Sequence, residues 1–207
     1  DLAYLRCVPN LLVMAPSDEN ELRNMLHTAL HHDGPAAFRF PRGASEGVAL
    51  DAQPTALELG KARVARSGGQ HADVLVVAIG TTVRAAVAAA EALAKDGVEA
   101  TVVDARFVKP LDEALICGEA AKTRRVVTVE EGALAGGFGA AVLEAFERSG
   151  LLAEGVSVKR LGLPDQFITH GDQAKQRAEL GIDATGIAAA CRALVGGRRP
   201  AAERGVA

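Results

Sequence analysis

The residue with the clearest chemical potential is Arg42, which lies in the short sequence Phe38–Gly43 (FRFPRG). It follows Pro41, a residue that ends a strand pattern, and open α/β sheets bind their ligands at the carboxyl ends of strands. A guanidinium at such a position can hold a phosphate or a carboxylate with two parallel hydrogen bonds. The alternative is a surface arginine in a salt bridge, because a single charge says little about its partner.

Two adjacent carboxylates, Glu130 and Glu131, end a β-rich segment that runs into the glycine-rich turn Gly136–Gly139. Neighbouring carboxylates can raise the pKa of one of the pair and serve in acid–base chemistry. Consecutive strand residues point to opposite faces, however, so the two groups are not expected to share one proton. We expect one carboxylate to accept backbone N–H groups from the turn or from the helix beyond it. No catalytic residue is assigned.

Histidines at helical spacing raise the question of a metal site. His27 and His31 lie four residues apart, which places both on one face of a helix. No HExxH motif is formed, His32 lies beside them, and no other His or Cys is near in sequence. We therefore expect a solvated helix end and no metal site. His170 is interpreted as a loop or capping residue near a helix start.

The elements before residue 45 form a β-α-β pattern that would position Arg42. Leu11–Met14 is a short apolar strand, and Asp18 can cap a following helix with Glu21 as its capping-box partner. A Gly-Pro pair ends that helix. Ala37–Phe40 is then a strand with its two phenylalanines on one face and Arg39 on the other.

A second, larger unit is expected from about residue 73. Strand and helix patterns alternate there, which predicts a doubly wound, mostly parallel α/β sheet with right-handed crossovers. Lys109 and Asp112 flank Pro110-Leu111 and are interpreted as a helix cap and its neighbour. The predicted strands are Val74–Ile79, Ala100–Val103, Arg125–Val129 and Ser157–Leu161, and the predicted helices are Val83–Lys95, Asp112–Ala121, Gly139–Arg148, Ala174–Glu179 and Ala184–Leu194.

Composition narrows the class of protein. Hydrophobic residues make up 49% and charged residues 24% of the 207 residues, aromatics only 3%, and the net charge is −3. Because acids and bases are interspersed, no basic field is available for nucleic acid or for an anionic membrane surface. No membrane span or signal peptide is recognisable. Cys7, Cys117 and Cys191 are odd in number and widely spaced, which favours reduced, small core residues in a cytoplasmic protein.

Five motifs, taken together, resemble the 1-deoxy-D-xylulose 5-phosphate synthase family, thiamine-diphosphate enzymes of the transketolase superfamily. The likeness extends from Asp1 to about residue 195, and the motifs occur in family order. They are Met14–Leu26 (MAPSDENELRNML), Phe38–Gly43 (FRFPRG), Val102–Leu111 (VVDARFVKPL), Val127–Gly139 (VTVEEGALAGGFG) and Arg160–Gly171 (RLGLPDQFITHG).

The resemblance implies the domain organisation. Residues 1–45 look like the end of a thiamine-diphosphate pyrimidine-binding domain, residues 46–72 a linker, residues 73–195 a transketolase C-terminal domain, and residues 196–207 a flexible tail. The chain also begins at Asp1 without methionine, so we expect a segment of a longer protein.

The family's activity implies substrates and a cofactor. The intact enzyme decarboxylates pyruvate and joins the two-carbon unit to D-glyceraldehyde 3-phosphate, which supplies precursors of isoprenoids, thiamine and pyridoxal. Arg42 matches the arginine of the family's (Y/F)PRG motif, which is implicated in binding the phosphate of glyceraldehyde 3-phosphate. A cytoplasmic homodimer with thiamine diphosphate and Mg²⁺ is implied.

The family's cofactor motifs are missing from this sequence. No GDG motif for the Mg²⁺-diphosphate is present, and the glutamate that contacts the aminopyrimidine ring is also absent. We therefore expect the chain alone to be inactive. Two alternatives stay open, the tail of a 2-oxoacid dehydrogenase E1 β-subunit or transketolase, and a dimerising scaffold module. FRFPRG, RFVKPLD and RLGLPDQFITHG as a set favour the synthase.

Overall fold

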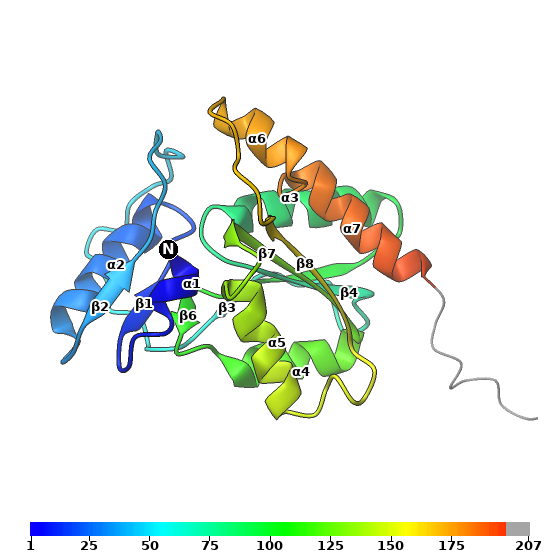
Figure 1. Cartoon of the computed structure of the whole chain (residues 1–207), viewed down its shortest axis with the longest axis horizontal. Helices are drawn as coiled ribbons and strands as arrows, with labels where there is room; N and C mark the ends of the chain where they lie inside the picture. The colour runs from blue at the N-terminus through cyan, green and yellow to red at the C-terminus, as the bar shows by residue number, and fades with distance from the viewer. Residues whose placement is uncertain (198–207) are drawn as a thin grey trace, which may run out of the picture.

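Two sheets of unequal size, described over residues 1–197 by a computed structural model, organise the chain (Figure 1). The smaller sheet has the strand order β2-β1-β6 and packs beside helix α2. Its elements are β1 (Leu12–Met14), α2 (Glu19–His31), β2 (Ala36–Phe38) and β6 (Phe107–Lys109), preceded by the short helix α1 (Leu2–Leu5).

The larger sheet has five strands in the order β3-β5-β4-β7-β8. All neighbouring pairs are parallel except β3 with β5, so β3 is an antiparallel edge strand. The strands are β3 (Arg63–Arg66), β4 (Val74–Ala78), β5 (Ala100–Asp104), β7 (Arg125–Ala133) and β8 (Ser157–Leu163). The predicted doubly wound, mostly parallel architecture is confirmed.

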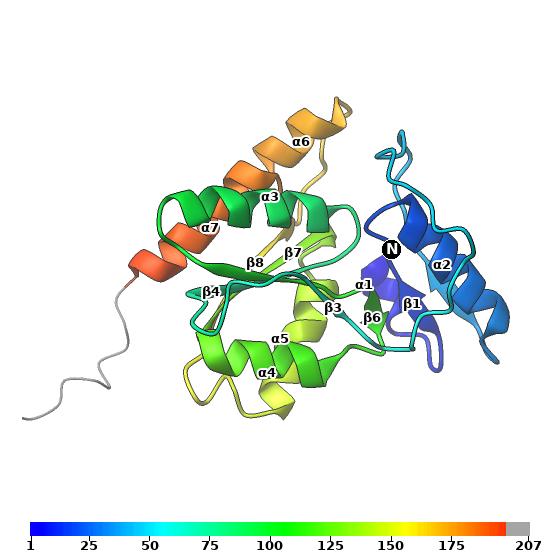
Figure 2. The ribbon, with the colours of Figure 1, turned by 180° about the vertical axis from the view of Figure 1, so that it is seen from behind.

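Helices cover both faces of this sheet, α3 (Thr82–Lys95) and α7 (Ala184–Gly196) on one side, α4 (Glu113–Thr123) and α5 (Phe138–Arg148) on the other (Figures 1 and 2). The central strand β4 is buried at all five positions, as expected of an apolar run covered on both faces. Leu75 and Val77 face α4 and α5, and Val74 and Val76 face α3 and α7.

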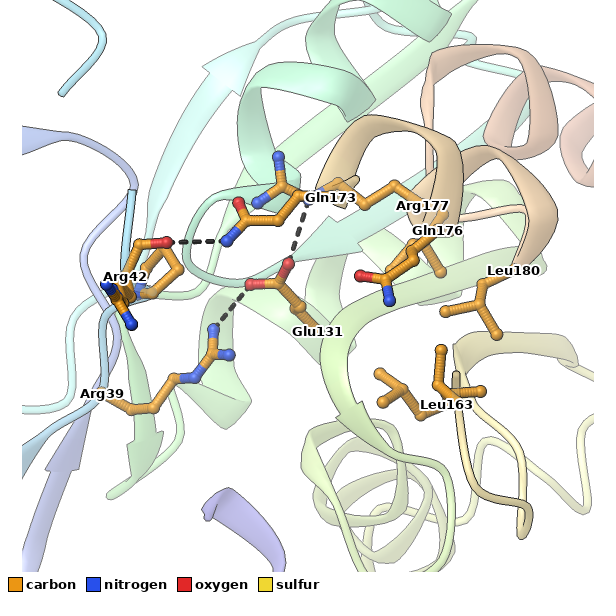
Figure 3. Close-up of a pocket in the computed structure, with 11 residues that line it drawn as sticks. Arg39, Arg42, Glu131, Leu163, Gln173, Gln176, Arg177 and Leu180 are labelled. Atoms are coloured by element: carbon orange, nitrogen blue, oxygen red, sulfur yellow. Dashed lines mark hydrogen bonds and ion pairs between the residues drawn. The ribbon is translucent and has the colours of Figure 1, made fainter. Parts of the chain in front are cut away.

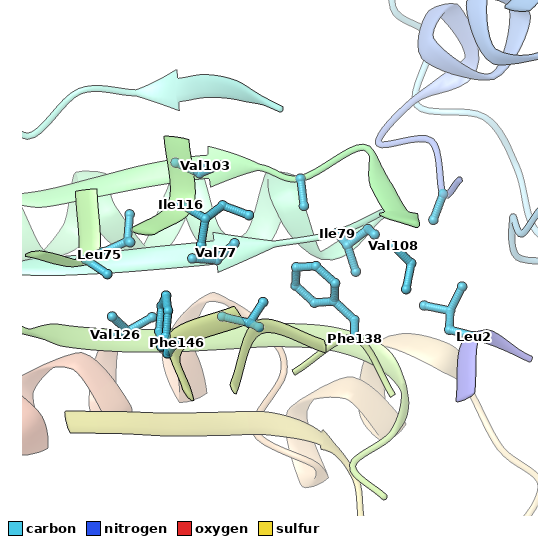
Figure 4. Close-up of a cluster of buried hydrophobic side chains, with 14 of the residues drawn as sticks. Leu2, Leu75, Val77, Ile79, Val103, Val108, Ile116, Val126, Phe138 and Phe146 are labelled. Carbon is cyan, nitrogen blue, oxygen red and sulfur yellow. The ribbon is translucent and has the colours of Figure 1, made fainter. Parts of the chain in front are cut away.

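The core beneath α4 and α5 continues into the N-terminal residues (Figure 4). Phe138 and Phe146 of α5 are fully buried there with Leu75 and Ile116. Leu2, Val13 of β1 and Val108 of β6 belong to the same apolar cluster. The smaller sheet is therefore packed against the larger one through shared apolar burial as well as through polar contacts.

Strand β6 was not anticipated from the sequence. It follows β5 but leaves the larger sheet and pairs antiparallel with β1, Val13 opposite Lys109. Its Phe107 is fully buried against Met14 and Met25. A segment from the middle of the chain thus completes the sheet formed by the first residues.

Of the two predictions for the start of helix α2, one is confirmed and one is wrong. Asp18 caps the helix, its carboxylate accepting from the backbone N–H of Glu21 at 2.8 Å. The capping-box role of Glu21 is wrong, because its buried carboxylate instead accepts two hydrogen bonds from Arg106, at 2.9 and 2.7 Å. A bidentate guanidinium is the stronger partner for a carboxylate removed from water.

The predicted linker contains the edge strand β3. Its Arg63 donates to the fully buried carboxylate of Asp104 at 3.1 Å. Burial raises the pKa of Asp104, and the charge of Arg63 opposes this. The proposed boundaries at residues 45 and 72 stay predictions, and the predicted tail lies, from residue 198 on, outside the described residues.

The cysteines differ in their surroundings. All three are free, as predicted. Cys191 is a buried core residue whose pKa burial raises to about 12, and Cys117 is partly buried. The expectation of a core position is wrong for Cys7, which lies exposed just after α1. Within residues 1–197, no helix combines the length and apolarity needed to cross a bilayer.

The pairing of β3 with the larger sheet predicts where an autonomous domain must begin. A fragment of residues 60–197 should unfold cooperatively and be more stable than residues 73–197, by about 1–3 kcal/mol for the hydrogen bonds to the buried Asp104 carboxylate. Denaturant unfolding of both fragments, with Arg63→Met in the longer one as control, measures this difference. Equal stability of the two fragments would contradict the role given to β3.

Candidate functional site

A pocket of about 260 Å³ lies where the two sheets meet (Figure 3). The segment after β2 contributes Arg39, Pro41 and Arg42, strand β7 contributes Glu131, and helix α6 (Gln173–Glu179) contributes Gln173, Gln176 and Arg177. Apolar side chains around β8 and α6 complete the wall. Three arginines against one glutamate give the lining an excess of positive charge, which suits an anionic ligand.

The strand period of two sends Arg39 into this pocket. Phe38 and Phe40 lie on the other face of the chain, their rings stacked 6.2 Å apart between centroids. Arg39 points away from them and donates from Nη1 to Oε2 of Glu131 at 2.8 Å. The predicted facing of these three side chains is confirmed.

Glu131 is a bridge between two arginines from distant parts of the chain. Its Oε1 accepts from Nε of Arg177 at 3.0 Å, while Oε2 accepts from Arg39. Burial acts to raise the pKa of Glu131, but the hydrogen bond from Arg39 and the charges of both arginines outweigh it and lower that pKa. The carboxylate is therefore ionised at neutral pH and holds α6 and the segment after β2 together.

Glu130 points to the opposite face and is 1% exposed. Its two oxygens accept from the backbone N–H groups of Phe138 and Gly139, each at 2.8 Å. Helix α5 has no side-chain cap from Gly137, so Glu130 supplies the cap from the strand. Burial raises the pKa of Glu130 against the effect of these two N–H groups. The predicted structural role, and the divergence of the two glutamates, are confirmed.

Position 137, just before the helix start that Glu130 caps, accepts only glycine. A Cβ on Gly137 would lie 2.2 Å from the carbonyl oxygen of Ala133 and 2.4 Å from Oε2 of Glu130. Either distance is far below van der Waals contact. The glycine-rich turn therefore serves close approach of the buried carboxylate to the helix start.

Arg42 lies exposed on the rim of the pocket. Within residues 1–197, its guanidinium takes part in no ion pair or hydrogen bond, whereas its carbonyl oxygen accepts from Nε2 of Gln173 at 2.7 Å. The salt-bridge alternative thus has no partner in the described chain. A free guanidinium facing an electropositive pocket remains available to a ligand.

The remaining candidates have local roles. His27 and His31 lie with ring centroids 4.3 Å apart, and Nδ1 of His31 is 2.8 Å from the carbonyl oxygen of His27. No group of three or more His, Cys, Asp or Glu able to hold a metal occurs among residues 1–197. His32, at the C-cap of α2, is partly buried, and His170 is exposed in the loop before α6.

The two residues near Pro110 behave as interpreted. Asp112 is the N-cap of α4, its side chain accepting from the backbone N–H of Leu115 at 3.1 Å. Lys109 donates to the carbonyl oxygens of Arg6 and Val8, at 3.2 and 2.6 Å. Neither residue reaches the pocket.

Four polar residues of the pocket lining were not identified from the sequence as site residues: Arg39, Gln173, Gln176 and Arg177. The strand period placed Arg39 opposite the phenylalanines, a signal that could have identified it. Arg177 and Gln173 lie on a helix more than 130 residues later, and no local pattern connects them with Arg42.

Comparison with known proteins gives two family matches. The model described as transketolase, C-terminal domain, matches residues 60–187, and that described as transketolase, pyrimidine binding domain, matches residues 1–46. The chain is also similar in structure to a split gene transketolase described as an inactive β4 tetramer, with a TM-score of 0.80 and 29% identity, covering 96% of this chain and 62% of that one.

Curated relatives are similar over all or nearly all of the chain. A 1-deoxy-D-xylulose-5-phosphate synthase of Anaeromyxobacter sp. (strain Fw109-5) is 73% identical over all 207 residues, which make up 32% of its length. Synthase 1 of Geobacter sulfurreducens is 51% identical over 195 residues, 94% of this chain and 30% of the relative. The chain thus spans about a third of the length of the curated relatives it matches.

The two glutamates should show opposite pH dependence. Because the pKa of Glu131 is lowered on folding, its stabilisation is present above about pH 5 and is lost as pH falls through its folded pKa. Because the pKa of Glu130 is raised, stability falls as its carboxylate ionises with rising pH. The free energy of unfolding, measured from pH 3 to 7 for wild type, Glu131→Gln and Glu130→Gln, tests both signs.

The difference between wild type and Glu131→Gln should grow in favour of wild type as pH rises, because glutamine resembles the protonated acid. The difference between wild type and Glu130→Gln should change in the opposite sense. Parallel pH profiles for the two differences would contradict the assignment of charge to these side chains.

Proposed function

Because the chain belongs to the family of transketolase C-terminal domains, we propose that it is the carboxyl-terminal part of a 1-deoxy-D-xylulose 5-phosphate synthase. The complete enzyme would condense pyruvate, with loss of CO₂, and D-glyceraldehyde 3-phosphate in the synthesis of isoprenoid, thiamine and pyridoxal precursors. The similarity of the whole chain to synthases supports this proposal.

The observation that carries the proposal for this chain is the guanidinium of Arg42, which has no ion pair or hydrogen bond within residues 1–197 and lines a pocket with excess positive charge. Glu131 neutralises part of the charge of Arg39 and Arg177, which leaves Arg42 as the cation available to a ligand. The phosphate of glyceraldehyde 3-phosphate is the fitting ligand, because a guanidinium binds phosphate in bidentate fashion. In this proposal Arg42 binds the substrate and takes no part in proton transfer.

Thiamine diphosphate, which the proposed activity requires, does not fit the residues of this chain. The sequence has no GDG motif, and the described residues include no carboxylate or histidine cluster able to hold Mg²⁺. We propose that thiamine diphosphate and Mg²⁺ bind to other parts of a longer protein, one as long as the curated relatives. There the cofactor supplies the carbanion chemistry. The family match of residues 1–46 supports dependence on the cofactor.

A second candidate function is a structural module for assembly without activity of its own. The similar structure described as an inactive β4 tetramer favours it.

We propose a homodimer for the complete protein, as its resemblance to the synthase family implies. The three unpaired cysteines support a reducing, cytoplasmic location, and the interspersed charges favour neither nucleic acid nor membrane as partner.

Arg42→Ala in a full-length synthase carrying this sequence should raise the KM for glyceraldehyde 3-phosphate about tenfold or more. A charge-assisted contact to phosphate contributes about 1.5–3 kcal/mol, and each 1.4 kcal/mol is about a factor of ten. Steady-state kinetics with each substrate varied in turn measure the effect. Arg192→Ala removes an arginine that is paired with Asp96 on the outer surface and serves as control. Wild-type kinetics for Arg42→Ala would reject the phosphate role.

The 207-residue chain alone should not bind thiamine diphosphate. Calorimetric titration with the cofactor and Mg²⁺ should be flat, because the diphosphate ligands lie outside this sequence. A full-length synthase titrated under the same conditions provides the positive control. Saturable micromolar binding by the short chain would overturn the proposal for the cofactor site.

A further inference from the structure

The main chain around Arg42 has few hydrogen bonds to the rest of the described structure. From Phe40 to Ser45, the described structure contains one hydrogen bond, the one from Nε2 of Gln173 to the carbonyl oxygen of Arg42 at 2.7 Å. On either side the chain is fixed, by β2 and the backbone N–H of Arg39 before it and by the contacts of Glu19 with the N–H groups after residue 45. The segment that carries the proposed phosphate ligand is thus tied down at one point.

Gln173 is placed for this contact by helix α6. It is the first residue of the helix, whose N-cap Asp172 accepts from the N–H of Lys175 at 3.0 Å. The helix buries none of its residues, and polar contacts help to position it. The ion pair of Arg177 with Glu131 and the hydrogen bond from Gln176 to the carbonyl oxygen of Thr169, at 2.6 Å, provide them.

Gln173 lies over the Arg42–Gly43 peptide with both ends of its amide. The nitrogen donates to Arg42, and the amide oxygen is 3.6 Å from the place that a Cβ on Gly43 would occupy. In Figure 3 the side chain of Gln173 extends from α6 toward Arg42, and a dashed line marks its hydrogen bond to the main chain there. The amide therefore fixes the peptide from which the Arg42 side chain starts.

We infer that Gln173 is a positioning residue for Arg42, holding the main chain so that the guanidinium stays directed at the phosphate pocket. The inference rests on the proposed phosphate role of Arg42 and adds a residue from the opposite wall of the pocket. A loop already ordered before the ligand arrives loses less conformational freedom on binding. Loss of the tie should weaken phosphate binding by about three- to tenfold, which corresponds to about 0.7–1.4 kcal/mol.

The test uses the 207-residue chain, with inorganic phosphate as the probe and nuclear magnetic resonance as the measurement. Gln173→Met keeps the length of the side chain and removes the donor. Gln70→Met makes the same change at an exposed residue in the turn before β4, away from α6 and outside the pocket lining. We expect backbone order of residues 41–44, measured without phosphate, to fall in Gln173→Met alone, and its phosphate Kd to rise three- to tenfold with an unchanged melting temperature.

Unchanged order and an unchanged Kd in Gln173→Met would overturn the inference, as would equal effects in Gln70→Met. If Gln173→Met fails to fold, Gln173→Asn, whose amide is one methylene too short, takes its place. The phosphate role of Arg42 is tested separately by phosphate-dependent shifts of its side-chain Nε signal and by a higher phosphate Kd in Arg42→Ala. Absence of those shifts in wild type would reject the phosphate role, while the order measurement would still decide whether Gln173 holds the segment.

Discussion

The arrangement of this chain depends on two consecutive carboxylates at the end of β7 that point in opposite directions. Strand β4 pairs with β7 only as far as Val129, so Glu130 and Glu131 extend beyond it. The strand period of two then sends one side chain under helix α5 and the other into the pocket. Glu130 fixes the start of a core helix, and Glu131 fixes the contact between two units. A one-residue shift in the register of β7 would turn Glu130 toward the pocket and Glu131 toward the buried start of α5. Each carboxylate would then lose the hydrogen-bond donors that it has in this structure.

The bridge made by Glu131 also determines the charge of the pocket. Two of the three arginines share this carboxylate, whose side chain is 18% exposed, and the third has no partner in the described chain. A pair that is partly removed from water is stronger than one on the open surface, although desolvation offsets part of the gain. Besides its effect on stability, the bridge determines the geometry of the pocket. It holds β7, α6 and the segment after β2 together around one position for a ligand.

Local sequence signals were sufficient for most of the helices and strands, though not for β6, and for one of the two glutamates. The unbroken apolar run of β4 predicts a strand buried on both faces, Asp18 predicts a helix start, and the glycine turn after Glu130 predicts a carboxylate bound to backbone N–H groups. These features depend on residues within about ten positions of one another. The alternation of Phe38, Arg39 and Phe40 also follows from the sequence, but the partner of Arg39 does not.

The features that the sequence did not predict are contacts between segments that are distant in the chain. Glu21 binds Arg106, which lies 85 residues later in the sequence, and does not form the expected capping box. Gln173 donates to Arg42, which lies 131 residues earlier. Strand β6 was missed for the same reason, since its pairing with β1 has no local signature in three residues. Such contacts depend on tertiary packing, which overrides local preference wherever a buried carboxylate or an unpaired strand finds a better partner.

The ion pair of Arg39 with Glu131 couples the smaller sheet to the larger one. A double-mutant cycle in the 207-residue chain, with Arg39→Met, Glu131→Gln and the double variant, measures that coupling as a free energy of unfolding. We predict a favourable interaction of about 1 kcal/mol or more at pH 7, within the range found for contacting charged side chains. Effects that add to within about 0.3 kcal/mol, the behaviour of independent sites, would contradict it.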